Sequence, residues 1–387
     1  LGGGFAGLRV ALWLARHARQ DELTVTLVDR ENAHVNPAWL YEVATAFNPF
    51  EREAVGTVLH GSASVPFERI FHGSGATFLQ RTVAHIDVAA RTLRCTNGDV
   101  LPTDMLVLAL GSQLATFNVP GIDTHAFSIK TLHEAIELRH HIVRQFLKYR
   151  SASRQRAERA FRFVVVGGGS AGVELAAELV FFLRRLATLH HVDQASPRVV
   201  LCEASDTILR EYPPPLRARS LRRLNALGVE IHSRESACAI GPGHLACRSG
   251  MVVESDTVVW LAGIRTHDLL LRLGVPVHPR GGVEVERTLE VKGANNVFAA
   301  GDCVFAVDPK TGKVAPDVVY AALQQGTVVA QNILRRLRGK SLISYLDRPR
   351  PTYATVGGKF ALVHLPPFQF AGRLGWATGR DNSLLGK

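Results

Sequence analysis

Two glycine-rich segments of the same type carry the clearest chemistry in this sequence. The pattern G-x-G-x-x-G occurs at residues 2–7 and again at residues 167–172. In such a segment the first glycine permits a tight turn out of a strand, the second lets the backbone approach a pyrophosphate, and the third lets helix and strand pack closely. The N-terminal amides of the following helix then point at the phosphates. Two dinucleotide sites in one chain predict electron transfer between a resident and a visiting nucleotide.

An acidic residue follows each motif at the end of a short apolar segment. Asp29 follows residues 23–28, and Glu203 follows residues 198–202. A carboxylate at this place accepts hydrogen bonds from ribose hydroxyls, so we predict that each acid holds a nucleotide. The predicted binding residues are Gly2, Gly4, Gly7 and Asp29 in the first unit and Gly167, Gly169, Gly172 and Glu203 in the second.

The surroundings of the two motifs differ. A motif alone is weak evidence, because any glycine-rich turn can match it. The second motif has its full context, with a predicted strand at residues 161–166 and a predicted helix at residues 171–189. The first motif opens the sequence without its strand. We therefore expect a fragment that lacks this central strand, and the sequence says nothing about a signal peptide.

Strand-like and helix-like segments alternate along the rest of the chain, which predicts an α/β fold. Asn97-Gly98 predicts a hairpin turn. Pro316 and Asp317 suit the start of a helix. The expected strands are residues 105–110, 255–261 and 296–302, and the expected helices are residues 131–159 and 318–337.

The composition bounds the class of protein. The 387 residues suit two or three domains, and 47% hydrophobic with 20% charged residues indicates a globular chain. No uninterrupted apolar run reaches the roughly 18 residues of a membrane-spanning helix. The net charge of +11 leaves three interpretations: a solvated basic surface, attraction to anionic lipid headgroups, or nucleic acid binding. Residues 148–162 carry few aromatics that could stack on bases, so we do not predict nucleic acid as a partner.

Cysteine and histidine spacing argues against metal and disulfide chemistry. The five cysteines form no C-x-x-C pattern, so neither a disulfide framework nor a thiol relay is indicated. Cys303 is expected to be a packing residue. The pairs His140-His141 and His190-His191 lie on predicted helices, where adjacent side chains diverge, and we predict no metal site.

The order of these features resembles that of the flavoproteins with two dinucleotide-binding domains, over nearly the whole chain. The resemblance implies an α/β fold of two Rossmann-like domains, in which the first motif holds FAD and the second, in an inserted domain, holds NAD(P)H. It further implies that Asp302 binds the ribityl region of the flavin, and that Gly111, Gly263 and Gly301 end strands beside the cofactors. The implied domains are 1–120 with 293–348 for FAD, 121–292 for NADH, and a C-terminal region at 349–387.

A closer match is to the type II NADH:quinone oxidoreductases, the single-subunit NADH dehydrogenases of respiratory chains that do not pump protons. The stretches that carry this resemblance are residues 40–45, 167–179, 260–264 and 321–326. The last resembles the family's quinone-site helix, whose pattern Ala-Gln-x-Ala-x-Gln-Gln sets two glutamines four residues apart on one helical face. Gln324 and Gln325 match it, and Tyr320 replaces the first glutamine. Tyrosine can still hydrogen-bond and stack on a ring, so we expect a quinone site here.

The resemblance implies electron transfer from NADH to FAD and then to quinone. Glu203 should repel a 2′-phosphate and favour NADH, although Arg198 and Arg210 nearby keep NADPH open. The helix that starts near Asp317 is expected to point its positive end at the flavin's pyrimidine ring. Glu174 is expected in the first turn of its helix. Either the helix dipole favours an acid there, or the side chain acts near the nicotinamide or in proton delivery, and both roles stay open.

The family resemblance also implies peripheral attachment to the cytoplasmic face of the cell membrane. The last stretch supports this weakly, because Pro366-Pro367 interrupts its aromatic segment and no clear amphipathic helix is visible. A homodimer is left open. The alternative functions are a soluble NAD(P)H-dependent reductase of another acceptor, a sulfide:quinone oxidoreductase, and a non-enzymatic, basic nucleotide-sensing scaffold. The second alternative needs paired redox cysteines, and none are evident.

Overall fold

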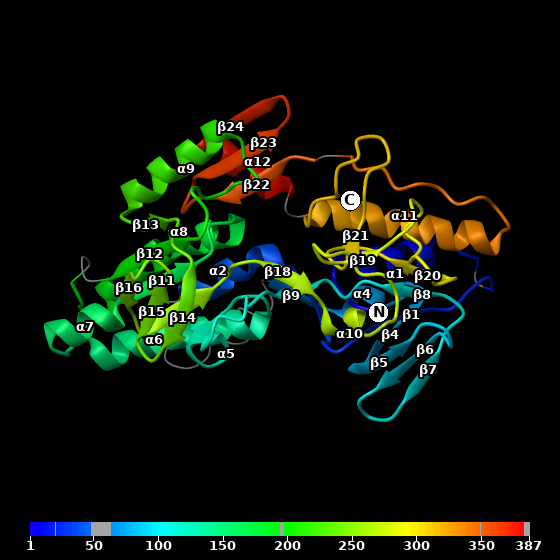
Figure 1. Ribbon diagram of the computed structural model, residues 1–387, viewed down its shortest axis with the longest axis horizontal. Coiled ribbons are helices and arrows are strands. Elements are labelled where there is room, and N and C mark those ends of the chain that lie inside the picture. Colours follow the sequence, from blue (N-terminus) through cyan, green and yellow to red (C-terminus); the bar gives the residue numbers. More distant parts are fainter. Residues whose placement is uncertain (20, 48–62, 194–196, 349, 383–387) are drawn as a thin grey trace. The chain divides into compact units, whose positions relative to one another are not determined.

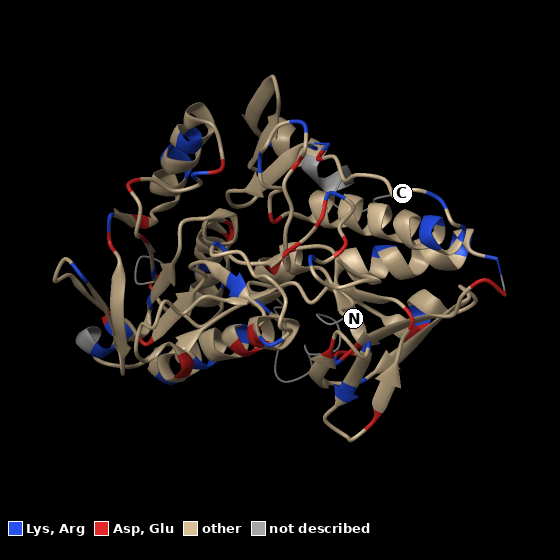
Figure 2. Ribbon diagram, turned by 45° about the vertical axis from the view of Figure 1, so that its right-hand side comes forward, with Lys and Arg blue, Asp and Glu red and all other residues tan. Residues whose placement is uncertain are grey.

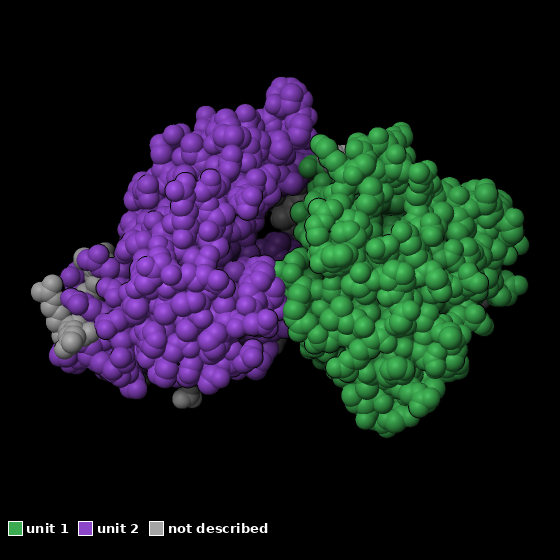
Figure 3. Space-filling view, in the orientation of Figure 1, with its two compact units in different colours: residues 1–35, 64–113, 264–350 green, residues 36–63, 114–263, 351–387 purple. Residues whose placement is uncertain are grey.

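The computed structural model describes residues 1–19, 21–47, 63–193, 197–348 and 350–382, which form two compact units (Figure 3). Unit 1 comprises Leu1–Val35, Ser64–Gln113 and Ile264–Arg350, and unit 2 comprises Asn36–Ala63, Leu114–Gly263 and Pro351–Lys387. Residues 264–292 thus fold with unit 1 and residues 351–387 with unit 2, whereas we had grouped the former with the NADH domain and the latter apart. Which nucleotide each unit holds stays a prediction.

A five-stranded parallel sheet forms the centre of unit 2 (Figure 1). Its order is β10-β17-β11-β12-β13, and Val164 of β11 pairs with Val200 on one side and Val258 on the other. The middle residues of these strands are apolar because both faces of the sheet are buried. The helix at residues 170–189 contacts the central strands, and the antiparallel strands within residues 237–254 share a core cluster with them. The strands are β10 (Ala126–Phe127), β11 (Arg162–Val166), β12 (Arg198–Glu203), β13 (Glu230–Ser233) and β17 (Thr257–Trp260).

Two helices of unit 2 were predicted from the sequence, of which one is confirmed and one is wrong. The predicted helix after the second motif is confirmed as α8 (Ser170–Leu189). The single helix predicted at 131–159 is wrong, because it divides into α6 (Leu132–Tyr149) and α7 (Arg154–Ala160). The two serines between them favour turns over helix interiors. The other helices are η1 (Pro37–Trp39), α2 (Leu40–Ala44), α5 (Ile122–His125) and α9 (Pro214–Leu227).

Two antiparallel three-stranded sheets complete unit 2. The first consists of β14 (Ala237–Gly241), β15 (His244–Cys247) and β16 (Val252–Glu254). The second consists of β22 (Thr352–Thr355), β23 (Ala361–Leu365) and β24 (Phe368–Gly372), and it leads into α12 (Arg373–Asn382). Pro366-Pro367 lies in the hairpin turn before β24, and α12 begins beyond this interruption, where the sequence predicted no clear amphipathic helix.

Two pairs of parallel strands form the centre of unit 1. The first pair is β1 (Val25–Asp29) with β4 (Ala76–Gln80), and the second is β8 (Leu106–Leu108) with β20 (Val297–Ala299). The opening residues lie between the pairs: Gly2 N donates to Val28 O at 2.9 Å, and Ala109 N donates to Leu1 O at 2.8 Å. This place corresponds to the central strand from which the first motif turns.

Helices α1 (Phe5–His17) and α11 (Val319–Leu337) pack closely in unit 1. A Cβ atom at Gly326 would lie only 2.7 Å from Ala6 O, so the helices can approach this closely only with glycine there. The helix predicted at residues 318–337 is confirmed as α11, whose N-cap is Val318 without a side-chain cap.

The smaller elements of unit 1 include the hairpin predicted at Asn97-Gly98, which is confirmed between β6 and β7. These elements are β2 (Ala33–Val35), β3 (Ser64–Pro66), α4 (Phe67–Phe71), β5 (Val83–Asp87), β6 (Thr92–Cys95), β7 (Val100–Pro102), α10 (Asp268–Leu271), β18 (Ile264–Thr266), β19 (Val283–Glu284) and β21 (Val304–Phe305). β9 (Ser112–Leu114) pairs with β18.

Basic and acidic residues are spread over both units (Figure 2). Within the described residues, no helix combines the length and the apolar character needed to cross a bilayer.

Candidate functional site

The first glycine motif forms a tight loop between the central strands of unit 1 and α1. Gly2 has φ +100°, and a Cβ atom on it would lie 2.2 Å from Ala109 O. A Cβ atom at Gly7 would lie 1.9 Å from Gly2 O, so neither position admits a side chain. Gly4 differs, because no atom lies within 4 Å of where its Cβ atom would be. The open side of the loop is therefore at Gly4, the N-cap of α1.

The predicted FAD residues outside the motif surround the same loop within unit 1. Asp29 Oδ2 accepts a hydrogen bond from Gly3 N at 2.5 Å, so this acid fixes the motif backbone. Asp302 Oδ2 accepts from Ser112 Oγ at 3.3 Å. Gly111 and Gly301 both have left-handed backbones, with φ of +64° and +86°. His34, which the sequence did not single out, donates through Nδ1 to Gly3 O at 2.9 Å.

The second motif repeats this geometry in unit 2. Gly167 has φ +114°, and its Cβ atom would lie 2.9 Å from Ala262 N. A Cβ atom at Gly172 would lie 1.8 Å from Gly167 O. No atom lies within 4 Å of the Cβ position at Gly169, the N-cap of α8. Gly263, with φ +72°, ends the segment after β17 in the same unit.

Glu203 has the place in unit 2 that Asp29 has in unit 1. Its Oε2 accepts from Gly168 N at 2.6 Å, and its Oε1 accepts from Ser205 N at 2.7 Å and from Ser205 Oγ at 2.6 Å. A carboxylate offers about four acceptor positions, so Glu203 keeps room for a ribose hydroxyl. Ser205 was not recognised in the sequence, because a serine two residues after a strand is unremarkable there.

Both loops fit the phosphates of a dinucleotide. Neither α1 nor α8 has a side chain that caps its N-terminus, and neither has an acid in its first turn. The free N-terminal amides and the positive end of each helix dipole therefore face the open space at Gly4 or Gly169. The donor set and the space agree with a bound FAD and a bound NADH.

Glu174 lies on α8 beyond its first turn, which holds no acid, so the expectation of a first-turn position is wrong. The helix dipole therefore does not explain an acid at this position, because its effect falls off within the first turn. Glu174 Oε1 accepts from Thr355 N on β22 at 3.0 Å. Burial, with smaller effects from the negative charges of Glu42 and Glu178, raises the pKa of Glu174 to about 8. At neutral pH this carboxyl group is mostly protonated and can donate a proton.

A chain of hydroxyl groups leads away from Glu174 within unit 2. Thr355 Oγ1 donates to Tyr41 OH at 3.0 Å, and Tyr41 OH donates to the exposed Glu42 at 3.2 Å. Tyr41 is buried, and burial raises its pKa. Neither Tyr41 nor Thr355 was singled out in the sequence. Tyr41 lies within the matched stretch at residues 40–45, but nothing in the sequence pointed to Thr355.

The predicted quinone residues on α11 divide into two groups. Tyr320 and Gln324 lie one turn apart on a partly exposed face. The side-chain amide of Gln324 makes two hydrogen bonds with the backbone of Arg348. Its Nε2 donates to Arg348 O at 2.8 Å, and its Oε1 accepts from Arg348 N at 3.0 Å. Gln325 is only 3% exposed, and its Oε1 accepts from Gly301 N at 2.7 Å. The structure thus brings Tyr320 and Gln324 together and directs Gln325 to the Gly301 turn.

The cysteines show no thiol chemistry. All five are free, and Cys303 is fully buried with its Sγ 3.2 Å from Ala300 O. Burial raises the pKa of the Cys303 thiol to about 11, which leaves it unreactive as a nucleophile. In the described part of the chain, no three metal-binding side chains come together.

Comparison with protein families gives one match over most of the chain. The model of the pyridine nucleotide-disulphide oxidoreductases matches residues 1–326. A curated relative, the type II NADH:quinone oxidoreductase of Staphylococcus aureus (strain NCTC 8325 / PS 47), is 30% identical over 360 residues, which cover 90% of this chain and 85% of the relative.

Solved structures with the same fold come from several enzymes. NDH2 from Plasmodium falciparum, in complex with NADH, has a TM-score of 0.87 at 16% identity and covers 100% of this chain and 94% of its own. The sulfide:quinone oxidoreductase of Aquifex aeolicus has a TM-score of 0.76 at 17% identity, covering 98% and 88%. The ferredoxin reductase of Rhodopseudomonas palustris has a TM-score of 0.73 at 20% identity, covering 94% and 80%. At these identities the neighbours establish the fold alone, with two Rossmann-like domains.

Proposed function

This chain belongs to the type II NADH:quinone oxidoreductases, within the pyridine nucleotide-disulphide oxidoreductase family, and from that premise we propose which of its residues carry out the reaction. It is an FAD-dependent NADH dehydrogenase that converts NADH, one proton and a quinone into NAD⁺ and a quinol, without pumping protons. The observation that carries the assignment is 30% identity over 90% of the chain, together with two nucleotide loops of matching geometry.

The two glycine loops have different ligands in this proposal. Gly2, Gly4 and Gly7 with Asp29 hold FAD, with Gly111, Gly301 and Asp302 beside it. Gly167, Gly169 and Gly172 with Glu203 hold NADH, and Gly263 ends the neighbouring segment. FAD, when bound, accepts a hydride from NADH and passes two electrons on to the quinone. The protein's part is to align the reactants and to control charge and protons around them.

We assign proton transfer to Glu174. The reaction takes one proton from water for each NADH oxidised, and a carboxyl group with a pKa of about 8 is suited to exchange it near neutral pH. Thr355 orients the carboxyl group through its amide, and the Thr355 and Tyr41 hydroxyls join it to Glu42 at the surface. We assign quinone contact to Tyr320 and Gln324, with Gln325 supporting the Gly301 turn of the same unit.

We place peripheral membrane contact on the β23–β24 hairpin and the first residues of α12 in unit 2 (Figure 1). Phe368 and Leu374 are 67% and 66% exposed, and Leu365 is 39% exposed. α9 packs against β24 and carries the exposed Arg219 and Arg222, which suit anionic headgroups beside an inserted apolar tip. Attachment to the cytoplasmic face and a homodimer complete the proposal.

Vesicle binding tests the membrane surface. F368D with L374D should abolish co-sedimentation with phosphatidylglycerol vesicles. The control is V252D, which adds a charge at another exposed apolar position of unit 2, where Val252 is 58% exposed. If the F368D/L374D double variant bound vesicles as well as V252D does, the membrane contact would lie elsewhere.

Anaerobic stopped-flow spectroscopy tests the function itself. NADH should bleach the flavin absorbance of the purified protein, and added quinone should restore it within the time of one turnover. A colourless preparation that releases no flavin on denaturation, or a flavin that NADH does not bleach, would refute the assignment.

A further inference from the structure

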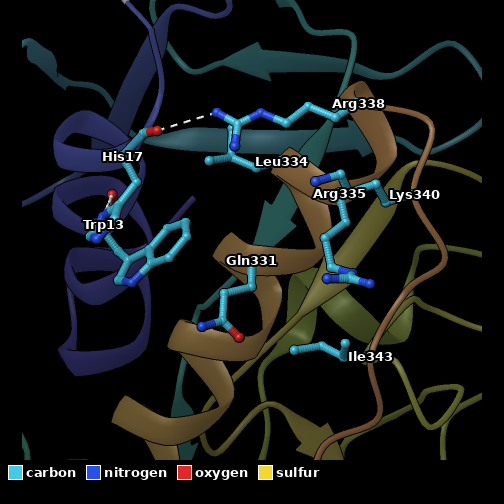
Figure 4. Close-up of a pocket in the computed structure, with 8 residues that line it drawn as sticks. All are labelled: Trp13, His17, Gln331, Leu334, Arg335, Arg338, Lys340 and Ile343. Atoms are coloured by element: carbon cyan, nitrogen blue, oxygen red, sulfur yellow. Dashed lines mark hydrogen bonds between the residues drawn. The ribbon is translucent and has the colours of Figure 1, made fainter.

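A cavity of about 350 Å³ lies in unit 1 between the C-terminal halves of α1 and α11 (Figure 4). It is separate from the nucleotide loop of the same unit, because Gly4 begins α1 and the cavity lies at its other end. A 13-residue helix places these ends about 20 Å apart. None of the residues that line the cavity belongs to the nucleotide or quinone assignments.

One side of this cavity is aromatic and apolar. The rings of Trp13 and His17 stack at 4.0 Å with an angle of 10° between them. His17 Nδ1 donates to Trp13 O at 2.8 Å, which holds the imidazole on the indole. Leu334 and Ile343 supply apolar surface opposite the indole. This side of the cavity therefore offers aromatic and apolar surface to a flat ring.

The other side is cationic. Arg335 donates through Nε to Ser341 O at 2.5 Å, which anchors its guanidinium group. Lys340 follows Gly339, beyond the end of α11. Among the described residues, no acidic side chain pairs with either one. Arg338, which also lines the cavity, is different because it pairs with Glu22 through two hydrogen bonds of 2.7 and 2.8 Å.

Basic residues at a helix C-terminus also stabilise the helix dipole, and this explains part of the cluster. It does not explain Lys340, which lies outside the helix, nor the stacked rings that face the cations across a cavity. A guanidinium and an ammonium group together favour a phosphate, and 350 Å³ is at the lower end of ligand-pocket volumes. We propose that this cavity binds a small phosphate ester with a planar ring, of the size of a nucleoside monophosphate.

Calorimetric titration of the FAD-loaded enzyme with adenosine 5′-monophosphate tests the proposal. Saturating NAD⁺ occupies the second glycine motif, so any remaining binding is outside it. The expected result is saturable binding that R335Q together with K340Q weakens at least tenfold. W13L should weaken binding of the nucleotide as well. R16Q is the control, because it removes an exposed charge from the last turn of α1 without changing the cavity lining.

Further titrations identify the ligand class. Adenosine and inorganic phosphate should each bind at least tenfold more weakly than the nucleotide. If short-chain phosphatidylglycerol bound to the enzyme and adenosine 5′-monophosphate did not, the proposal would be overturned in favour of a lipid headgroup. Equal binding by wild type and the double variant, with melting temperatures of the two unchanged, would overturn it outright. None of these readouts depends on NADH oxidation, so they stand apart from the proposed catalytic roles.

Discussion

The amide of Thr355 donates to the carboxyl group of Glu174 at 3.0 Å, although 181 positions separate the two residues. This bond ties the C-terminal sheet of unit 2 to the helix that follows the second nucleotide loop. It orients a carboxyl group whose pKa is about 8, beside a buried tyrosine and two further acids. Thr355 and Tyr41 therefore belong to the candidate site as positioning residues.

Glu174→Gln should lower turnover about 100-fold while FAD stays bound, because glutamine keeps the hydrogen bond from Thr355 but cannot exchange a proton. Steady-state kinetics with a flavin-content measurement checks this. Glu178→Gln is the control, since Glu178 lies one turn further along α8 and accepts from Gly358 N. Unchanged kinetics in Glu174→Gln would leave Glu174 with no part in proton transfer.

The stability of unit 2 should depend on pH through Glu174. Its folded pKa of about 8 exceeds its usual value of 4.5, so between these values the folded state binds more protons than the unfolded state. The contribution of Glu174 to the stability of the folded state is therefore greatest below pH 4.5, and it falls as the pH rises toward 8. Glu174→Gln should remove this contribution. The melting temperature of the variant minus that of the wild type should therefore rise between pH 5 and pH 8. Glu42, Glu178, Tyr41 and Tyr212 also face this group, so differential scanning calorimetry should compare the two proteins at each pH.

The second and third glycines of the second motif, Gly169 and Gly172, should respond differently to alanine. At Gly169 the added methyl group meets no protein atom, so Gly169→Ala should change stability by no more than about 1 kcal/mol. It should nevertheless weaken NADH binding at least tenfold, because the methyl group enters the space left for the pyrophosphate. Gly172→Ala should cost about 1–3 kcal/mol of stability, since its Cβ atom would lie 1.8 Å from Gly167 O. Denaturant melts and NADH titration separate the effects, and tight NADH binding by Gly169→Ala would show that the phosphates lie elsewhere.

Nucleotide preference should shift when Glu203 loses its charge. Glu203→Gln keeps one acceptor oxygen, which can accept from Gly168 N or from Ser205 N but not from both, and it no longer repels a 2′-phosphate. We expect kcat/KM for NADPH relative to NADH to rise about tenfold, equivalent to about 1.4 kcal/mol. Glu211→Gln is a suitable control, because Glu211 accepts from Ser170 Oγ and lies outside the acid position of the motif. A preference for NADH that survives Glu203→Gln would mean that another group sets it.

Much of this architecture is local and was therefore predictable from the sequence. Each strand–glycine–helix unit encodes its own turn, and the hairpin at Asn97-Gly98 needs only two residues. The break between α6 and α7 was missed because the two serines that mark it stand among Ala, Arg, Lys and Gln residues, which favour helix. The contact between Glu174 and Thr355 could not be predicted, since it depends on how a separate sheet packs against α8. The same holds for Gln325, whose motif indicates a quinone contact but whose amide binds the Gly301 turn.

Substitutions on α11 should separate quinone contact from structural support. Gln325→Ala leaves Gly301 N without its acceptor in a buried place, so we expect a loss of about 1–3 kcal/mol in stability and of FAD retention. Tyr320→Phe and Gln324→Ala lie on the partly exposed face and should instead raise KM for quinone several-fold, with the rate of flavin reduction by NADH unchanged. Thr327→Val is the control on the same helix, because its hydroxyl donates to Leu323 O within α11. Stopped-flow measurement of the two half-reactions resolves these effects. If Tyr320→Phe and Gln324→Ala slowed flavin reduction and left quinone reduction intact, the quinone assignment on this face would be wrong.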